Sequence, residues 1–172
     1  MDPEPRFRAL ISQHLRIDVM ACLSVFLGAI ALMLLASCST RTPAADTLPK
    51  GTLVFHTAAG DRTLRVEIAE TGDARAHGLM ERPSLAPDTG MAFLFPELNQ
   101  EGFWMRNTLI PLSIAFWDES GRIIAILDMQ PCPADPCPTY APAATYAGAV
   151  ETNLDYFEEH QVKAGDTVEL GR

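Results

Sequence analysis

Hydrophobic and polar residues alternate in short runs along the chain from residue 51 onward. In the clearest run, Leu64, Val66 and Ile68 are separated by Arg65 and Glu67. A period of two places successive side chains on opposite faces, so this run predicts a strand with one buried face. Similar patterns predict strands over residues 52–57, 62–69, 90–95, 102–108, 110–116, 122–129, 145–150 and 167–170. We therefore expect a mainly β domain, a small β-sandwich or barrel-like fold with one or two short helices.

Turn residues and local composition refine the order of these strands. The pair Gly60-Asp61 lies between the first two strands and favours a hairpin there. Pro96 is expected to end the strand over residues 90–95. The middle of the 122–129 run is apolar at consecutive positions, which predicts a strand covered on both faces at the centre of the sheet.

Two segments favour short helices. Residues 71–79 are polar and contain alanines, which is typical of an exposed helical turn. Thr152, with Asp155 three residues later, has the spacing of a capping box. That spacing predicts a helix over residues 153–160.

A long uncharged run precedes the predicted domain. Residues 19–40 contain no charged side chain, arginines precede the run, and the small residues Ala36 and Ser37 lie directly before Cys38. This order is typical of a bacterial lipoprotein signal peptide, so we expect residues 1–37 to be removed and Cys38 to carry lipid. A run of this length is also long enough to cross a bilayer as an uncleaved helix. A buried core helix is a third alternative.

The two membrane interpretations predict the same topology. Arg6, Arg8 and Arg16 precede the run and only Arg41 follows it closely, which places the N-terminus in the cytoplasm. The rest of the chain is then extracytoplasmic and anchored to the cell envelope membrane, in the periplasm if the envelope is double. Residues 38–50 are small, polar and proline-containing, as expected of a lipid anchor and flexible tether before a domain over residues 51–172.

The net charge of the chain excludes some classes of binding partner. It has 13 Lys and Arg against 22 Asp and Glu, a net charge of −9. The signal-peptide segment has equal numbers of each sign, so the negative charge lies entirely in the remainder. An acidic domain cannot release counterions from phosphates through a basic face, so we expect no nucleic-acid partner. The same balance argues against docking on anionic lipid through a basic patch.

The cysteines fit an oxidising compartment. Cys22 lies in the apolar run and Cys38 is expected to carry lipid, which leaves Cys132 and Cys137 in a proline-rich segment. Outside the cytoplasm this pair favours a disulfide that closes a short loop. A zinc site or a redox-active pair is an alternative, although further ligands and a C-x-x-C spacing are missing from the neighbouring sequence.

Several motifs together resemble a known bacterial and archaeal family, domain of unknown function 192. They are GLMER at residues 78–82, GMAFLF at 90–95 and FWMRNTLIPL at 103–112, followed by Gly121, Pro131-Cys132, Cys137-Pro138-x-Tyr140, Glu151 and Gly165-Asp166. The resemblance covers about residues 51–170 and implies a compact, β-rich, extracytoplasmic or lipid-anchored protein. It brings no established activity. The chain departs from the family at Ser113, where Asp is common, and at residues 153–155, where the family tends to have a glycine-containing turn.

Six residues are the candidates for a ligand site. They combine a flat aromatic side chain with groups that donate and accept hydrogen bonds, and they are Arg82, Trp104, Arg106, Asn107, Tyr140 and Glu151. The alternative is a structural network in which Trp104 packs the core, Asn107 caps a turn and Arg82 pairs with Glu151. The sequence shows no nucleophile beside a histidine, so we assign no catalytic residue. We also assign no metal and no cofactor.

These observations favour an extracytoplasmic accessory module. We expect it to be held to the membrane by lipid at Cys38 and to bind a small ligand or an envelope protein. The alternatives are an envelope hydrolase that uses Glu151 as acid or base and a purely structural lipoprotein.

Overall fold

The computed structural model of the protein describes residues 47–172, and Asp46–Arg172 form one compact unit. The predicted signal peptide, the predicted lipidation site Cys38 and most of the predicted tether lie outside the described residues. Neither helix between residues 47 and 172 has the length and apolar character needed to cross a membrane.

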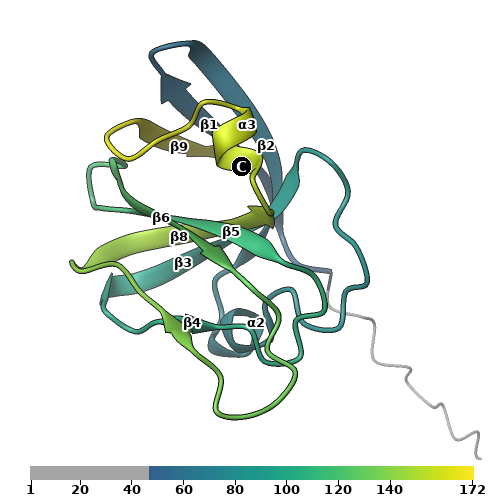
Figure 1. The fold of residues 1–172 in the computed structure, drawn as a ribbon. Coiled ribbons are helices and arrows are strands. Elements are labelled where there is room, and N and C mark those ends of the chain that lie inside the picture. Colours follow the sequence, from purple (N-terminus) through teal and green to yellow (C-terminus); the bar gives the residue numbers. More distant parts are fainter. Residues whose placement is uncertain (1–46) are drawn as a thin grey trace, which may run out of the picture. The chain divides into compact units, whose positions relative to one another are not determined.

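The prediction of a mainly β fold is confirmed (Figure 1). The elements are β1 (Lys50–Thr57), β2 (Gly60–Ala69), α2 (Gly72–His77), β3 (Thr89–Asn99), β4 (Phe103–Trp104), β5 (Leu112–Trp117), β6 (Ile123–Met129), β7 (Thr139–Tyr140), β8 (Tyr146–Asn153), α3 (Tyr156–Glu159) and β9 (Thr167–Gly171). A seven-stranded mixed sheet has the order β6-β5-β8-β3-β2-β1-β9, and β4 and β7 form a separate two-stranded sheet.

The large sheet curls without closing into a barrel. Its edge strands, β6 and β9, meet near one end, where Arg122 and Thr167 form an isolated bridge. Gly121 directly precedes Arg122 and has a positive φ of 77°. A Cβ atom at this position would lie 2.6 Å from the carbonyl oxygen of Val168. Glycine therefore permits the close approach of the two edges.

The chain leaves the end of β2 and passes through α2 before it enters β3. The predicted hairpin of β1 and β2 is confirmed, but β2 then pairs with β3 in parallel, which requires a crossover connection. The short helix α2 provides part of that connection, and the Thr71 side chain accepts a hydrogen bond from the backbone N–H of Ala74 at its start. The helix predicted over residues 71–79 is thus confirmed, with narrower limits.

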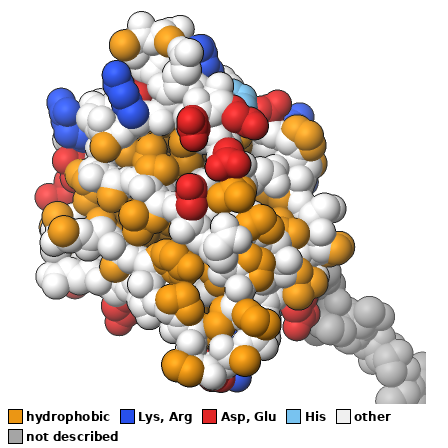
Figure 2. All heavy atoms as spheres, viewed as in Figure 1, with side chains coloured by type: hydrophobic (Ala, Val, Ile, Leu, Met, Phe, Trp, Pro, Cys, Tyr) orange, Lys and Arg blue, Asp and Glu red, His pale blue; other side chains and the backbone are white. Residues whose placement is uncertain are grey.

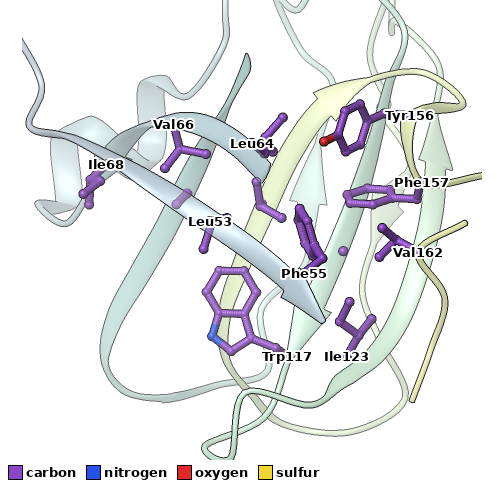
Figure 3. Close-up of a cluster of buried hydrophobic side chains, with 13 residues drawn as sticks. Leu53, Phe55, Leu64, Val66, Ile68, Trp117, Ile123, Tyr156, Phe157 and Val162 are labelled. Atoms are coloured by element: carbon purple, nitrogen blue, oxygen red, sulfur yellow. The ribbon is translucent and has the colours of Figure 1, made fainter. Parts of the chain in front are cut away.

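Alternation along the strands gives the large sheet two hydrophobic faces. One face carries a cluster that includes Leu53, Phe55, Leu64, Val66 and Ile68, and Phe157 of α3 meets Phe55 edge to face within it (Figure 3). The other carries a second cluster, whose members are Ala69, Leu79, Met91, Phe93, Met105, Leu112, Ile114, Phe116, Met129, Tyr146 and Ala149. The second face is the one that the loops of the candidate site cover.

The prediction that the 122–129 strand is central is wrong. β6 lies at the edge of the sheet and pairs only with β5. Its apolar side chains are partly buried all the same, because Ile126 packs against one hydrophobic cluster and Leu127 against the other. An edge strand can be covered on both faces, so its composition did not reveal its place in the sheet.

Three further boundaries differ from the sequence prediction. The strand expected over residues 102–108 is limited to β4, because the chain turns at Asn107, where φ is 57°. β3 continues through Pro96, but its pairing with β8 shifts between Leu94 and Asn99. The short helix predicted over residues 153–160 is confirmed with narrower limits as α3, but the capping box is wrong, because the buried Thr152 hydroxyl donates to the carbonyl of Thr89 and α3 begins only after Asp155.

Candidate functional site

Two of the six predicted site residues, Trp104 and Tyr140, lie on the small two-stranded sheet, and Arg106 follows β4 closely. Trp104 pairs with Thr139, and its neighbour Phe103 pairs with Tyr140. The guanidinium of Arg106 lies 5.8 Å from the centre of the Trp104 ring and 3.2 Å from a carboxylate oxygen of Asp135. Trp104 remains 49% exposed, whereas Tyr140 shares with Phe103 the opposite face of the small sheet, which packs against the core.

The predicted disulfide holds this region. Cys132 and Cys137 are bonded, with their Cα atoms 5.7 Å apart, which confirms the pairing. The loop between them carries Asp135, the partner of Arg106, and leads directly into β7. Cys132 also forms an isolated bridge with Arg106. The disulfide therefore fixes the segment that positions Arg106 beside Trp104.

Asn107 connects two loops through its backbone. Its backbone is in the left-handed conformation, which Asn tolerates better than most residues, and its carbonyl accepts a hydrogen bond of 2.8 Å from the N–H of Glu81. Asn107 thereby joins the loop after α2 to the loop after β4.

Arg82 is held away from these aromatic residues. Its guanidinium donates two hydrogen bonds, of 2.8 and 2.6 Å, to the two carboxylate oxygens of Glu67 on β2. This bidentate pair lowers the pKa of the Glu67 carboxyl below its ordinary value. The alternative in which Arg82 pairs with Glu151 is wrong.

Glu151 lies beneath the surface, in the middle of β8. It is 5% exposed and sits between Met91 and Ile114 of the neighbouring strands, both fully buried. No ion pair or side-chain hydrogen bond reaches its carboxyl group among the described residues, and burial alone raises its pKa to about 8. A carboxyl in this environment is kept neutral near pH 7.

The surface carries an aromatic cleft beside β4. We use this name for the hollow of about 350 Å³ lined by Gly72, Arg75, Ala76, Phe93, Phe95, Asn99, Glu101, Gly102, Phe103, Trp104 and Tyr146. Of the predicted site residues, only Trp104 lines it. Its volume falls in the range that suits a small organic ligand.

The walls of the aromatic cleft are fixed by packing and hydrogen bonds. The rings of Phe95 and Tyr146 meet edge to face with their centres 5.4 Å apart. The Asn99 amide donates to the Tyr146 hydroxyl, which in turn donates to the backbone carbonyl of Glu101. Burial raises the pKa of Tyr146 to about 12, so this hydroxyl keeps its proton. The cleft is therefore largely preformed.

One cation lies at the rim of the aromatic cleft. The Arg75 guanidinium lies 5.1 Å from the centre of the Phe95 ring and donates to the carbonyls of Glu70 and Leu94. Sequence reasoning missed Arg75, Phe95, Asn99, Glu101 and Tyr146. The alternation of Phe93 and Phe95 was the only signal that pointed here, whereas Arg75 and Asn99 come from α2 and the end of β3, which only the fold brings together.

A second hollow, the acidic cleft, lies on the other face of the sheet near α3. Its volume is about 780 Å³, and it is lined by Ala58, Ala59, Ser113, Ile126, Asp128, Asp155, Phe157, Glu158, Gln161, Val162, Lys163 and Ala164. Figure 2 shows acidic side chains gathered beside hydrophobic ones in the region of α3. Among residues 47–172, no group of three His, Cys, Asp or Glu side chains is arranged to hold a metal ion.

Ser113, at the position where the resemblance led us to expect Asp, lies at the edge of the acidic cleft. Its hydroxyl donates to a carboxylate oxygen of Asp128, 2.6 Å away, and accepts a hydrogen bond from the backbone N–H of Asp155. The serine thus joins β5, β6 and the start of α3 without adding a second carboxylate beside Asp128.

The fold and its surface define a small, mainly β domain that carries preformed clefts and a buried carboxyl. The chain belongs to the domain of unknown function 192 family, described as an uncharacterized ACR family, whose model matches residues 54–170. This confirms the family to which the sequence motifs pointed.

Two solved structures are similar to this chain. A protein from Sinorhizobium meliloti 1021, named a "putative transcription regulator", has 31% sequence identity and a TM-score of 0.66, with 72% of this chain and 95% of that chain covered. A protein of unknown function from Novosphingobium aromaticivorans DSM 12444 has 30% identity and a TM-score of 0.68, with 73% and 89% covered. No curated protein matches the chain.

Proposed function

We propose that this protein is an extracytoplasmic module, anchored to the envelope membrane through lipid at Cys38, that binds a small ligand in the aromatic cleft. The uncharged run over residues 19–40 and the small residues before Cys38 support the anchor. The disulfide between Cys132 and Cys137 supports an oxidising compartment, because such bonds are rare in the cytosol.

The observation that carries the binding proposal is the half-exposed Trp104 ring at the edge of a preformed aromatic cleft. Soluble domains expose few large aromatic side chains, and a rigid one beside a hollow is typical of a binding site. The walls are apolar, and Arg75, Asn99 and Glu101 add polar groups at the rim. This combination fits a small molecule with a flat apolar face and several hydrogen-bonding groups, such as a sugar ring, or one side chain of an envelope protein.

The surroundings of Glu151 do not favour the hydrolase alternative. A catalytic carboxyl must reach the substrate, but Glu151 is buried and lines none of the hollows described on residues 47–172. Nor do we transfer the role named for the Sinorhizobium protein. The domain carries twice as many acidic as basic residues between positions 47 and 172, which opposes binding to DNA.

Native mass spectrometry tests the binding proposal without knowledge of the ligand. The protein is purified from its host envelope, and its native and denatured masses are compared. We expect an added mass that disappears on denaturation and that is lost from Trp104→Ala, because truncation of an aromatic side chain that contacts the ligand costs about 2 kcal/mol or more. A wild-type protein with equal native and denatured masses would contradict the proposal.

A matched variant separates binding from folding. Leu109 is also exposed, at 58%, but does not line the aromatic cleft. Leu109→Ala should keep the bound mass, and both variants should unfold at temperatures close to that of the wild type. Equal loss of bound mass from both variants would show that Trp104 has no specific role.

A further inference from the structure

A third hollow, which we call the basic cleft, lies over the β1–β2–β9 end of the large sheet. It has a volume of about 780 Å³ and is lined by Lys50, Gly51, Thr52, Arg65, Val66, Glu67, Arg82, Ser84, Leu85, Ala86, Thr89, Gly90, Gly171 and Arg172. It shares no lining residue with the aromatic cleft. A ligand in the basic cleft would therefore bind independently of one in the aromatic cleft.

The charge of this hollow is opposite to that of the domain. Four of the nine Lys and Arg residues between positions 47 and 172 line it, but only one of the eighteen Asp and Glu residues in that range. Cations gathered in one hollow repel one another, so an anion bound there relieves their repulsion. A concave site that concentrates one sign of charge attracts ligands of the opposite sign.

Ion pairs neutralise only part of this charge. Glu67 binds Arg82, and Arg172 lies 2.8 Å from a carboxylate oxygen of Glu70. Lys50 and Arg65 have no ion-pair partner among the described residues. Within residues 47–172 the cleft therefore presents two cations outside any ion pair, of which Lys50 also helps to lower the pKa of the nearby Glu67 carboxyl.

The position of Arg65 suits a bound anion. The register aligns Arg65 with Thr52 on β1 and Thr89 on β3, so these three side chains project from one face of the sheet. One nitrogen of its guanidinium makes a long contact of 3.5 Å with the carbonyl of Pro87, and the remaining donors are free of protein partners within the described residues. Ser84 and Thr52 add hydroxyl groups to the lining.

We propose that the basic cleft binds a phosphate group. A phosphate monoester carries a charge of about −1.5 to −2 near pH 7, which matches the two unpaired cations. Its oxygens accept parallel hydrogen bonds from a guanidinium, and an ammonium group adds a point charge. The group belongs either to a small soluble phosphorylated molecule or to a phospholipid headgroup.

Isothermal titration calorimetry with sn-glycerol 3-phosphate tests the soluble source. Residues 39–172 contain the compact unit and both of its hydrophobic clusters, so this chain is expected to fold without the N-terminal segment. We expect Arg65→Gln to weaken binding about tenfold, which corresponds to about 1.4 kcal/mol, because the variant loses a hydrogen bond to a charged group. Arg122 is a matched exposed arginine with one backbone partner outside the cleft, and Arg122→Gln should change affinity less than about twofold.

Flotation with vesicles of phosphatidylglycerol and phosphatidylcholine tests the lipid source with the same variants. Binding in either experiment that is lost in Arg65→Gln and kept in Arg122→Gln supports the proposal and identifies the source. Absence of binding in both experiments overturns it, as does equal weakening by the two variants. Succinate that binds as tightly as glycerol phosphate also overturns the phosphate assignment. Trp104→Ala should leave phosphate binding unchanged, so this test and that of the aromatic cleft can fail separately.

Discussion

Glu67 and Glu151 lie in one row across the sheet, on either side of Met91, but their carboxyl groups have opposite environments. Glu67 receives two hydrogen bonds from Arg82, and its pKa is lowered. Glu151 is buried without a partner, and its pKa is raised to about 8. Two glutamates on the same face of one sheet therefore make opposite contributions to stability as the pH changes.

Glu151→Gln should increase stability at neutral and alkaline pH. The unfolded carboxyl ionises near pH 4.5, whereas the folded one stays neutral up to about pH 8. Below pH 4.5 the carboxyl is protonated in both states, and Glu151 does not lower stability. Between pH 4.5 and about 8 the unfolded carboxyl ionises while the folded one stays neutral, so the free energy of unfolding falls as the pH rises. Gln does not ionise, so the variant should gain about 3 kcal/mol at pH 7 and almost nothing at pH 4. Urea unfolding at several pH values measures this difference.

Glu67→Gln provides the control of opposite sign. Because the folded pKa of Glu67 is lowered, its stabilisation is present above the unfolded pKa and is lost as the pH falls through the folded one. This variant should therefore be less stable than the wild type at pH 7, with a difference that shrinks in acid. If the effect of Glu151→Gln were the same at every pH, Glu151 would be ionised in the folded state, contrary to its burial.

At the scale of elements, the small β4–β7 sheet is the least self-sufficient part of the domain. Each strand has two residues, far fewer than an independently stable hairpin needs. The disulfide beside β7 and the edge-to-face contact of Phe103 with Phe93, 4.9 Å between centres, attach it to the core. The position of Trp104 depends on these two attachments.

Replacement of both disulfide cysteines should loosen this element while the large sheet remains folded. The Cys132→Ser, Cys137→Ser variant loses the closure of a short loop, worth about 2 kcal/mol in the chain-entropy model. We expect a lower melting temperature and faster hydrogen exchange in the segment 130–140, with unchanged protection of β8 and β3. Wild-type protein treated with dithiothreitol should behave in the same way. Uniform loss of protection would show that the disulfide stabilises the whole domain.

Across the whole domain, acidic and basic side chains gather in different clefts. The acidic cleft and the basic cleft lie on different faces of one sheet, although the net charge of the chain is −9. That net charge argued against a basic face for nucleic acid and against a basic patch for anionic lipid. It is an average over the surface and does not report how cations that are distant in sequence, such as Lys50 and Arg82, come together.

The attachment of the chain to the membrane can be tested by intact mass. If Cys38 is lipidated, the wild-type protein should lack residues 1–37 and carry a lipid-modified N-terminus, whereas Cys38→Ser should retain those residues because the peptidase acts on the lipidated form. If the apolar run is instead an uncleaved transmembrane helix, both proteins should retain residues 1–37 and differ only by the substitution. The second outcome would overturn the lipoprotein proposal but keep the extracytoplasmic location.

The sequence by itself determined what depends on neighbours along the chain. Alternation predicted most strands, the Cys132–Cys137 spacing predicted the disulfide, and motifs such as FWMRNTLIPL at residues 103–112 identified the family. These signals are local because side-chain period, short-loop closure and motif spacing are properties of consecutive residues.

The tertiary structure alone decided which strands are neighbours and which side chains meet. The edge position of β6, the parallel pairing of β2 with β3 and the partnership of Arg82 with Glu67 all join segments that are separate in sequence. Of the six predicted site residues, the fold brings Arg106 beside Trp104, packs Tyr140 against the core on the other face of the small sheet, and separates Arg82 and Glu151 from them. Hydrogen bonding between strands and burial of both sheet faces set these contacts, and neither leaves a signal in the spacing of residues along the chain.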